Sequence, residues 1–309
     1  MKLKFAAIFL PFILSGCFYY THPKYNVEQI HSLPTYTEPV SADTLSIFNS
    51  IGTINITPST DENLSIDCQI IYNGPNTDDF KAKTKDVILT PYVENDVILL
   101  EALVNNTNYW RWLDINIDDD RLEMVYDIKI PSYIENLRII NEIGKINIEN
   151  TTTSLDLQQI TGIINCSNVS IMDFSDIFLD NGQLTFSCDN FLEVDNISHF
   201  VNTGSIKFSS NNLSNLNYLF NKVNVGTLSC QLPAEKSSYL IANSFIPDLD
   251  FSLEKNPFIS EDVIQTYRAQ LLADKNYTEY KNMSLDSDSD QPLPTIVANS
   301  IDVGVVSIE

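Results

Sequence analysis

Residues 144–230 repeat one short phrase, in which a glycine is followed by alternating residues: Gly144-Lys-Ile-Asn-Ile148, Gly162-Ile-Ile-Asn-Cys166, Gly182-Gln-Leu-Thr-Phe186, Gly204-Ser-Ile-Lys-Phe208 and Gly226-Thr-Leu-Ser-Cys230. The phrase also occurs at Gly52 and at Gly304, so it accounts for seven of the nine glycines. The five central glycines are 18, 20, 22 and 22 residues apart. A repeat of about twenty residues is typical of solenoids, whose successive coils stack on one another.

Each phrase predicts a short strand that starts at a corner. The apolar residues are two positions apart, so they share the buried face of a strand. A glycine before the strand can take positive φ or let another backbone approach closely, which a corner requires. We therefore expect the repeat glycines to be structural residues and one inward column to form from Ile146, Ile164, Leu184, Ile206 and Leu228.

Two further apolar groups in each period suggest three inward faces per coil. One includes Val169 with Ile171. The other lies just before the next glycine and consists of Ile160, Ile177 with Leu179, Phe200, and Phe220 with Val223. An antiparallel sandwich is the alternative fold. It is disfavoured because two-residue hairpin turns such as Asn-Gly are absent from the repeat, except at Asn181-Gly182.

The predicted fold is therefore all-β: a right-handed parallel β-helix or β-solenoid with an N-terminal β-rich extension and one short α-helix near the C-terminus. The extension covers residues 43–135 and continues into the solenoid of residues 136–309. An insertion at about 233–295 lacks the repeat. Within it, Ser260 is a good helix N-cap, and a helix running to about Lys275 would cover the last coil.

Residues 1–16 have the features of an export signal. Lys2 and Lys4 precede a short apolar core that is too brief to span a bilayer as a mature helix. The sequence Leu14-Ser-Gly-Cys17 resembles the lipobox of bacterial lipoproteins, which implies diacylglycerol and a palmitate-type acyl chain on Cys17. Residues 17–42 then read as a lipidated tether. The expected location is the cell envelope, in the outer membrane if the cell has one.

The formal net charge of -23 argues against nucleic acid as a partner, because nucleic-acid binding needs a basic surface. Asp286, Asp288 and Asp290 are a weak candidate set for Ca²⁺, but the stretch lacks the glycine and glutamate of an EF-hand loop. A solvated loop is favoured there. The other cysteines, Cys68, Cys166, Cys188 and Cys230, are favoured as buried thiols over disulfides.

The chain also resembles the bacterial envelope families known as "putative adhesins", in which a strand ending in proline leads into Gly-x-Ile phrases. The resemblance rests on Asp127-Ile-Lys-Ile-Pro131 and on Asn141-Glu-Ile-Gly144-Lys-Ile146, and it covers about residues 43–232 and 296–309. It implies a β-solenoid and brings no catalytic residues.

The function expected from the sequence is a non-catalytic lipoprotein that presents a surface to a protein or glycan in the envelope. No motif for a nucleotide, a zinc ion or a serine nucleophile is present, so neither an enzyme nor a cofactor is expected. Two alternatives stay open: a polysaccharide-active β-helix enzyme, and an envelope-stress or assembly partner of a membrane protein.

Overall fold

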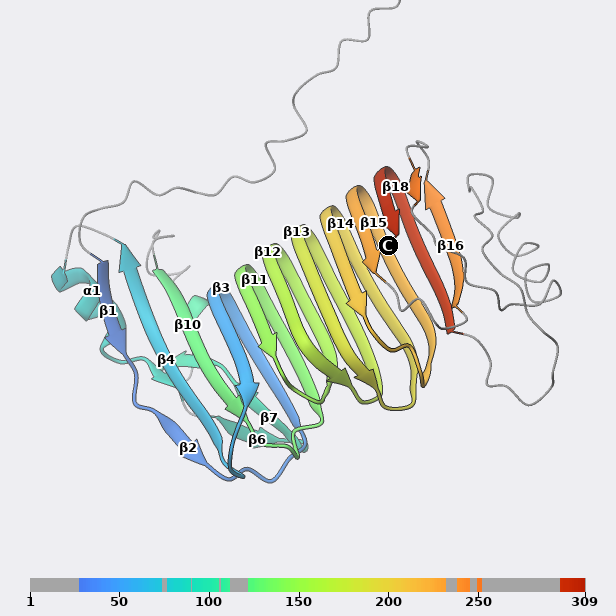
Figure 1. The fold of residues 1–309 in the computed structure, drawn as a ribbon. Coiled ribbons are helices and arrows are strands. Elements are labelled where there is room, and N and C mark those ends of the chain that lie inside the picture. Colours follow the sequence, from blue (N-terminus) through green and yellow to red (C-terminus); the bar gives the residue numbers. More distant parts are fainter. Residues whose placement is uncertain are drawn as a thin grey trace, which may run out of the picture.

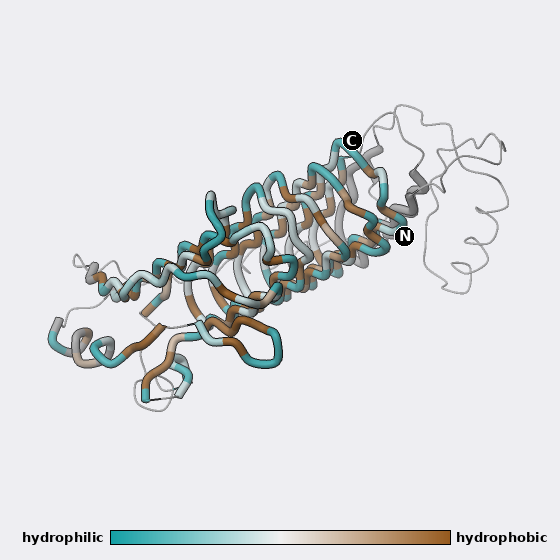
Figure 2. The backbone as a smooth tube through the Cα atoms, turned by 90° about the horizontal axis from the view of Figure 1, so that it is seen from below, coloured by the Kyte–Doolittle hydropathy of each residue, from teal (hydrophilic) through white to brown (hydrophobic). Residues whose placement is uncertain are grey.

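The protein is a β-solenoid built from long parallel strands (Figure 1). The structure is a computed structural model that describes residues 28–73, 77–89, 91–105, 107–111, 122–231, 238–244, 249–251 and 295–308. The stacked strands are β3 (Thr44–Pro58), β11 (Asn136–Glu149), β12 (Ser154–Ile171), β13 (Phe174–Phe191), β14 (Val194–Ser210), β15 (Leu216–Gln231) and β18 (Thr295–Ile308). They pair side by side in that order, which gives the rod seen in Figure 2.

The repeat glycines set the register of the stack. Gly52, Gly144, Gly162, Gly182, Gly204, Gly226 and Gly304 each pair with the glycine of the neighbouring coil. In β13, for example, Gly182 has a φ of 147°. Such a conformation is accessible to glycine and strained for other residues. The seven phrases of the sequence thus form one glycine column along the rod.

Each long strand folds over along its length, so that one coil has two arms (Figure 1). The buried side chains of β13 show the change of face, because Leu179 lies three residues before Gly182 and Leu184 lies two residues after it. Leu179 and Leu184 are thus an odd number of positions apart, whereas residues on one face of a flat strand are an even number apart. We call the segment before the glycine the first arm and the segment after it the second arm.

The predicted inward column is confirmed: Ile146, Ile164, Leu184, Ile206 and Leu228 are all buried and pair coil to coil. The prediction for the apolar group before the glycine holds for Ile177, Leu179 and Val223, which are buried, and fails for its other members. Ile160 is 51% exposed and Phe220 is 38% exposed, while Phe200 is half-buried. The reason is that the coil has two arms, so the apolar group before the glycine divides between the inner and outer faces of the first arm.

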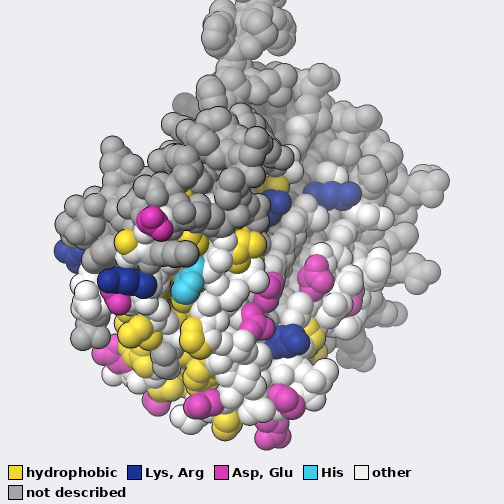
Figure 3. Space-filling model, turned by 90° about the vertical axis from the view of Figure 1, so that its left-hand side faces the viewer, with side chains coloured by type: hydrophobic (Ala, Val, Ile, Leu, Met, Phe, Trp, Pro, Cys, Tyr) yellow, Lys and Arg dark blue, Asp and Glu magenta, His cyan; other side chains and the backbone are white. Residues whose placement is uncertain are grey.

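The N-terminal extension lengthens the sheet beyond β3. Its strand β10 (Leu122–Ile130) pairs with β3 in parallel, and β4 (Leu64–Asn73) pairs antiparallel with β10. The strands β1 (Glu28–Ser32) and β2 (Tyr36–Glu38) pair antiparallel with β4. Figure 3 views this end of the rod, where hydrophobic, acidic and basic side chains are mixed.

A second group of short elements lies between β4 and β10. It comprises α1 (Thr77–Thr84), β5 (Ile88–Leu89), β6 (Tyr92–Glu94), β7 (Val97–Leu100), β8 (Ala102–Val104) and β9 (Thr107–Asn108). β7 pairs in parallel with the start of β3. Trp110 is buried, and its indole Nε1 donates to Asn49 Oδ1 at 3.0 Å. This group of short elements between β4 and β10 is therefore packed onto the first coil.

The C-terminal strand β18 pairs in parallel with β15 on one side. On its other side it pairs with β16 (Ser238–Ser244) and β17 (Leu249–Phe251). The helix predicted for Ser260 to Lys275 lies outside the described residues. In the part of the chain that is described, no helix has both the length and the apolar character needed to cross a membrane.

Candidate functional site

Two predicted sites lie outside the described residues: Cys17, and the set Asp286, Asp288 and Asp290. The remaining cysteines are buried free thiols. Burial raises the pKa of Cys188 and of Cys230 to about 12, and it raises the pKa of Cys68 and of Cys166 further. Because the thiolate is the reactive form, these cysteines are unsuited to nucleophilic chemistry or metal binding.

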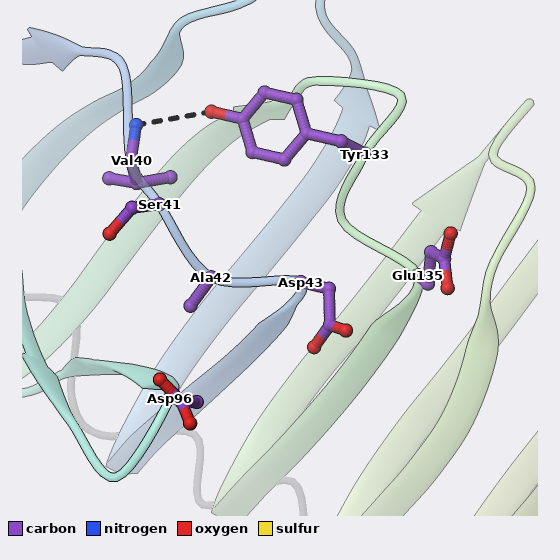
Figure 4. Close-up of a pocket in the computed structure, with 7 residues that line it drawn as sticks. All are labelled: Val40, Ser41, Ala42, Asp43, Asp96, Tyr133 and Glu135. Carbon is purple, nitrogen blue, oxygen red and sulfur yellow. Dashed lines mark hydrogen bonds between the residues drawn. The ribbon is translucent and has the colours of Figure 1, made fainter.

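A hollow of about 590 Å³ lies where the extension meets the first coils (Figure 4). Its acidic lining consists of Asp43, Asp96 and Glu135. Among the described residues, no three metal-ligating side chains converge closely enough to hold an ion. The Tyr133 hydroxyl accepts from the Val40 amide at 3.1 Å and donates to the Glu62 carbonyl at 3.0 Å, so it joins two loops. The hollow is therefore a structural junction.

A chain of polar side chains crosses the core between β13 and β18. Ser175 Oγ lies 3.3 Å from His199 Nε2, His199 Nδ1 lies 3.1 Å from Asn221 Oδ1, and Asn221 Nδ2 donates to Asn299 Oδ1 at 3.0 Å. Since the Asn221 oxygen can only accept, His199 carries its proton on Nδ1 and accepts from Ser175. The donors then all point toward β18.

This set has the residue types of a serine–histidine–asparagine constellation, but it has no access for a substrate. His199 is 0% exposed and packs against Phe186, with ring centroids 4.5 Å apart. Burial lowers the pKa of His199 to about 3, with the hydrogen bond to Asn221 opposing the shift. The ring is therefore neutral at physiological pH. These hydrogen-bonded side chains serve to satisfy buried polar groups between coils.

His199 makes the stability of the solenoid depend on pH. In the unfolded chain a histidine has a pKa of about 6.5. Between that pH and about 3, the unfolded chain therefore binds a proton at this residue, whereas the buried ring of the folded chain stays neutral. We expect this group to contribute its full stability above pH 6.5 and to lose about 1.4 kcal/mol per pH unit as the pH falls toward 3, about 5 kcal/mol in all. Urea unfolding of His199→Gln should lack this slope, because glutamine does not titrate.

The half-buried His31 of β1 offers the matched control. His31→Gln removes one histidine from the unfolded chain as well, yet it should keep the acid slope of the native protein. If His199→Gln and His31→Gln lost the slope equally, the buried ring would not be its source.

The outer face of the first arm carries a set of exposed apolar side chains, which we call the outer band. It consists of Ile140, Ile143, Ile160, Phe178, Phe200, Tyr218 and Phe220. Apart from the half-buried Phe200, its members are between 38% and 51% exposed. Phe178 and Phe200 pair in register, and their rings stack at 5.3 Å with an interplanar angle of 7°. Single exposed apolar residues are normal, whereas a stacked aromatic pair with further exposed apolar residues on the same arm favours a contact surface.

Carboxylates flank the outer band. Asp176 and Asp180 stand two residues before and two residues after Phe178, on the same outward face of β13. Asp180 accepts from Asn202 Nδ2 at 2.7 Å, and Asn202 Oδ1 accepts from Asn224 Nδ2 at 2.8 Å. An acidic and amide row therefore runs beside the aromatic row.

The outer face of the second arm differs in chemistry. Asn165 donates to Asn147 at 3.0 Å, Asn147 donates to Asn55 at 2.8 Å, and Asn55 donates to Asp127 at 2.8 Å. The same outward position on the following coils is occupied by Thr185, Lys207 and Ser229, which pair in register. The second arm is polar, so the apolar surface of the rod is concentrated on the first arm.

Sequence reasoning missed the outer band because it assigned Ile160, Phe200 and Phe220 to the core. The alternation of the strand could have revealed it, because Phe178 lies between Ile177 and Leu179, which are both buried. In a strand, an apolar residue between two inward residues must point outward.

Comparison with known families and with curated proteins finds no match. Solved structures with detectable similarity include a "putative adhesin" from Bacteroides fragilis, which is 16% identical and covers 90% of this chain and 97% of that chain at a TM-score of 0.39. A "putative cell adhesion protein" from Clostridium sporogenes is 14% identical, covering 91% and 98% at a TM-score of 0.30. A "putative lipid binding protein" from Parabacteroides distasonis is 11% identical, covering 93% and 98% at a TM-score of 0.31. Similarity at this level does not indicate what this chain binds.

Proposed function

We propose that the protein is an exported, lipid-anchored and non-catalytic rod that presents its outer band to a partner in the cell envelope, in the manner of an adhesin. The observation that carries the proposal is the outer band itself, with the stacked pair Phe178 and Phe200 at its centre. Aromatic side chains dominate binding energy at protein surfaces. Here they stand on paired strands, so little conformational entropy is lost when they bind.

The absence of catalysis in this proposal rests on where the reactive groups lie. The histidine, serine and asparagine that could act together are sealed in the core. In the acidic hollow near Asp43, the Tyr133 hydroxyl is engaged by Val40 and Glu62 and serves to join two loops. The surface that remains is one of side chains that stack and form hydrogen bonds.

The anchor in this proposal is the lipobox cysteine, Cys17. The described chain begins at β1, which lies at the end of the rod formed by the extension, while the outer band lies on β11 to β15 (Figure 1). A lipid attached before β1 would thus hold one end of the rod and leave the band free to meet a partner.

Replacing the two stacked phenylalanines tests the proposal. We expect Phe178→Ser/Phe200→Ser to weaken binding at least tenfold, because central aromatic residues contribute about 2 kcal/mol or more each. Binding of the full chain to immobilised glycans and to purified envelope proteins measures the effect. Both side chains point outward, so circular dichroism should show an unchanged fold.

Tyr92 of β6 is the matched control, since it is 39% exposed and lies outside the outer band. Tyr92→Ser should bind like the native chain. Equal binding by the double variant and the native chain would refute the role of the band. Release of reducing sugar from any bound glycan would refute the non-catalytic part.

A further inference from the structure

We propose that the outer band takes a cationic occupant, namely an extended protein segment whose band-facing side chains are Lys or Arg at one end and apolar at the other. The inference rests on the proposed function, because it names the chemistry of the partner that the band would bind. Three features of the first arm carry it: an aromatic ring between two carboxylates, two carboxylates in register on adjacent coils, and an Asn202 amide that is already engaged.

The first feature is the placement of Phe178. Its ring stands between the carboxylates of Asp176 and Asp180 along one strand face, and it stacks on Phe200 of the next coil. The face of an aromatic ring attracts an ammonium or guanidinium group, and a nearby carboxylate adds an ion pair. A basic side chain laid over Phe178 would make both contacts.

The second feature is the negative charge at Asp176, which stands in the register between Asp156 and Ser198, whereas Asp156 also has Arg138 beside it. Asp156 and Asp176 pair in register on adjacent coils, where like charges disfavour one another. Partial burial, and then the Asp156 charge, raises the pKa of Asp176. Within the described part of the chain, the recorded ion pair joins Lys85 to Asp86, away from this site. A cation supplied by the partner would relieve this repulsion.

The ends of the band set where the cation would lie. Arg138 stands next to Asp156 in the register on one side, and Lys222 stands next to Phe200 on the other. Both would repel a basic group. We therefore place the basic residues of the occupant over β12 and β13, and its apolar residues over Phe200, Tyr218 and Phe220.

The third feature argues against a neutral glycan. Sugar hydroxyls need free donors and acceptors, but Asn202 spends its amide nitrogen on Asp180 and its oxygen on Asn224. A neutral glycan would also bring no cation to Asp176. From β11 to β15 the band spans about 19 Å, which suits an extended segment of about six residues.

The experiment uses the full chain and a synthetic peptide of about nine residues, enough to span the band, with lysine at positions 1 and 3, valine at positions 5, 7 and 9 and serine between them, so that one face carries both kinds. A matched peptide has glutamine in place of lysine. Isothermal titration calorimetry should show that the lysine peptide binds at least tenfold more tightly than the glutamine peptide. Added salt should weaken its binding.

Any acidic protein attracts a polycation, so the decisive comparison is positional. Asp156→Asn/Asp176→Asn and Glu94→Gln/Glu149→Gln remove the same charge, and the second pair is exposed and lies off the band. We expect the first double variant to lose at least tenfold in peptide affinity and the second to stay within about twofold. Phe178→Ser should also lose at least fivefold, in line with a cation–π contact of about 1 kcal/mol.

Equal losses in the two charge variants would overturn the inference, because they would show only a general attraction. Failure of the lysine peptide to bind the native chain would overturn it too. If a neutral oligosaccharide bound instead, and Phe178→Ser weakened it, the cationic occupant would be wrong while the proposed function stood. If neither probe bound and the envelope partners ignored the Phe178→Ser/Phe200→Ser variant, both would fail.

Discussion

Gly182→Ala is expected to lower the free energy of unfolding by at least about 4 kcal/mol. A Cβ added to Gly182 would overlap with the carbonyl oxygen of Gly162 on the neighbouring coil. The φ of 147° is also strained for alanine, which alone costs about 1–3 kcal/mol. Because one glycine packs on the next along the rod, the coil can accept the methyl group only by separating from its neighbour. Urea unfolding followed by circular dichroism measures the loss.

The adjacent residue provides the control for this prediction. Gln183 is exposed, lies on the same strand and is one residue beyond the corner. Gln183→Ala should change the stability by no more than about 0.5 kcal/mol. Similar stability of Gly182→Ala and Gln183→Ala would mean that the corners do not need glycine.

Cys17→Ala is expected to move the protein almost completely from the membrane fraction to the soluble fraction of the producing cells. Two or more acyl chains give stable anchoring, and each buried methylene contributes about 0.8 kcal/mol. A net charge of -23 cannot replace them, since anionic lipid surfaces repel it. Cell fractionation followed by immunodetection measures the distribution.

Cys68→Ala serves as the control for the anchor. Cys68 is a buried thiol of β4, so its loss should leave the protein in the membrane fraction. Retention of Cys17→Ala at the membrane would show that another part of the chain holds it there, and the lipobox interpretation would then be abandoned.

The inward columns could be predicted because they depend only on local alternation. Ile164 and Leu184 follow their glycines at the same spacing, and a spacing of that kind places them on one face whatever the rest of the chain does. The parallel stacking followed from the length of the period. In a sheet of hairpins the chain would turn back about every ten residues, whereas these glycines recur about every twenty residues.

The outer band could not be predicted from composition, since apolar residues are expected to be buried. Phe200 follows the polar core residue His199, which reverses the usual assignment of inside and outside at that point of β14. No sequence motif singles out His199. Only the structure shows that it continues a column whose other members include Asn221 and Asn299.

The order of strands in the extension was also beyond the sequence. Nothing local in Leu64 to Asn73 indicates that this strand runs antiparallel to β10, or that β10 enters the sheet next to β3. Such pairings join residues far apart in the chain, and alternation is the same for parallel and antiparallel strands.

The long in-register ladders between coils have a mechanical consequence. Hydrogen bonds between strands point from one coil to the next, so they run along the rod. A force applied at β18 against a hold at β1 would therefore load every bond of an interface together, including the twelve paired positions between β15 and β18. A sideways force on one terminal strand would break the same bonds one after another. The rod should therefore resist tension along its length, whereas its terminal strand should detach easily under a sideways force.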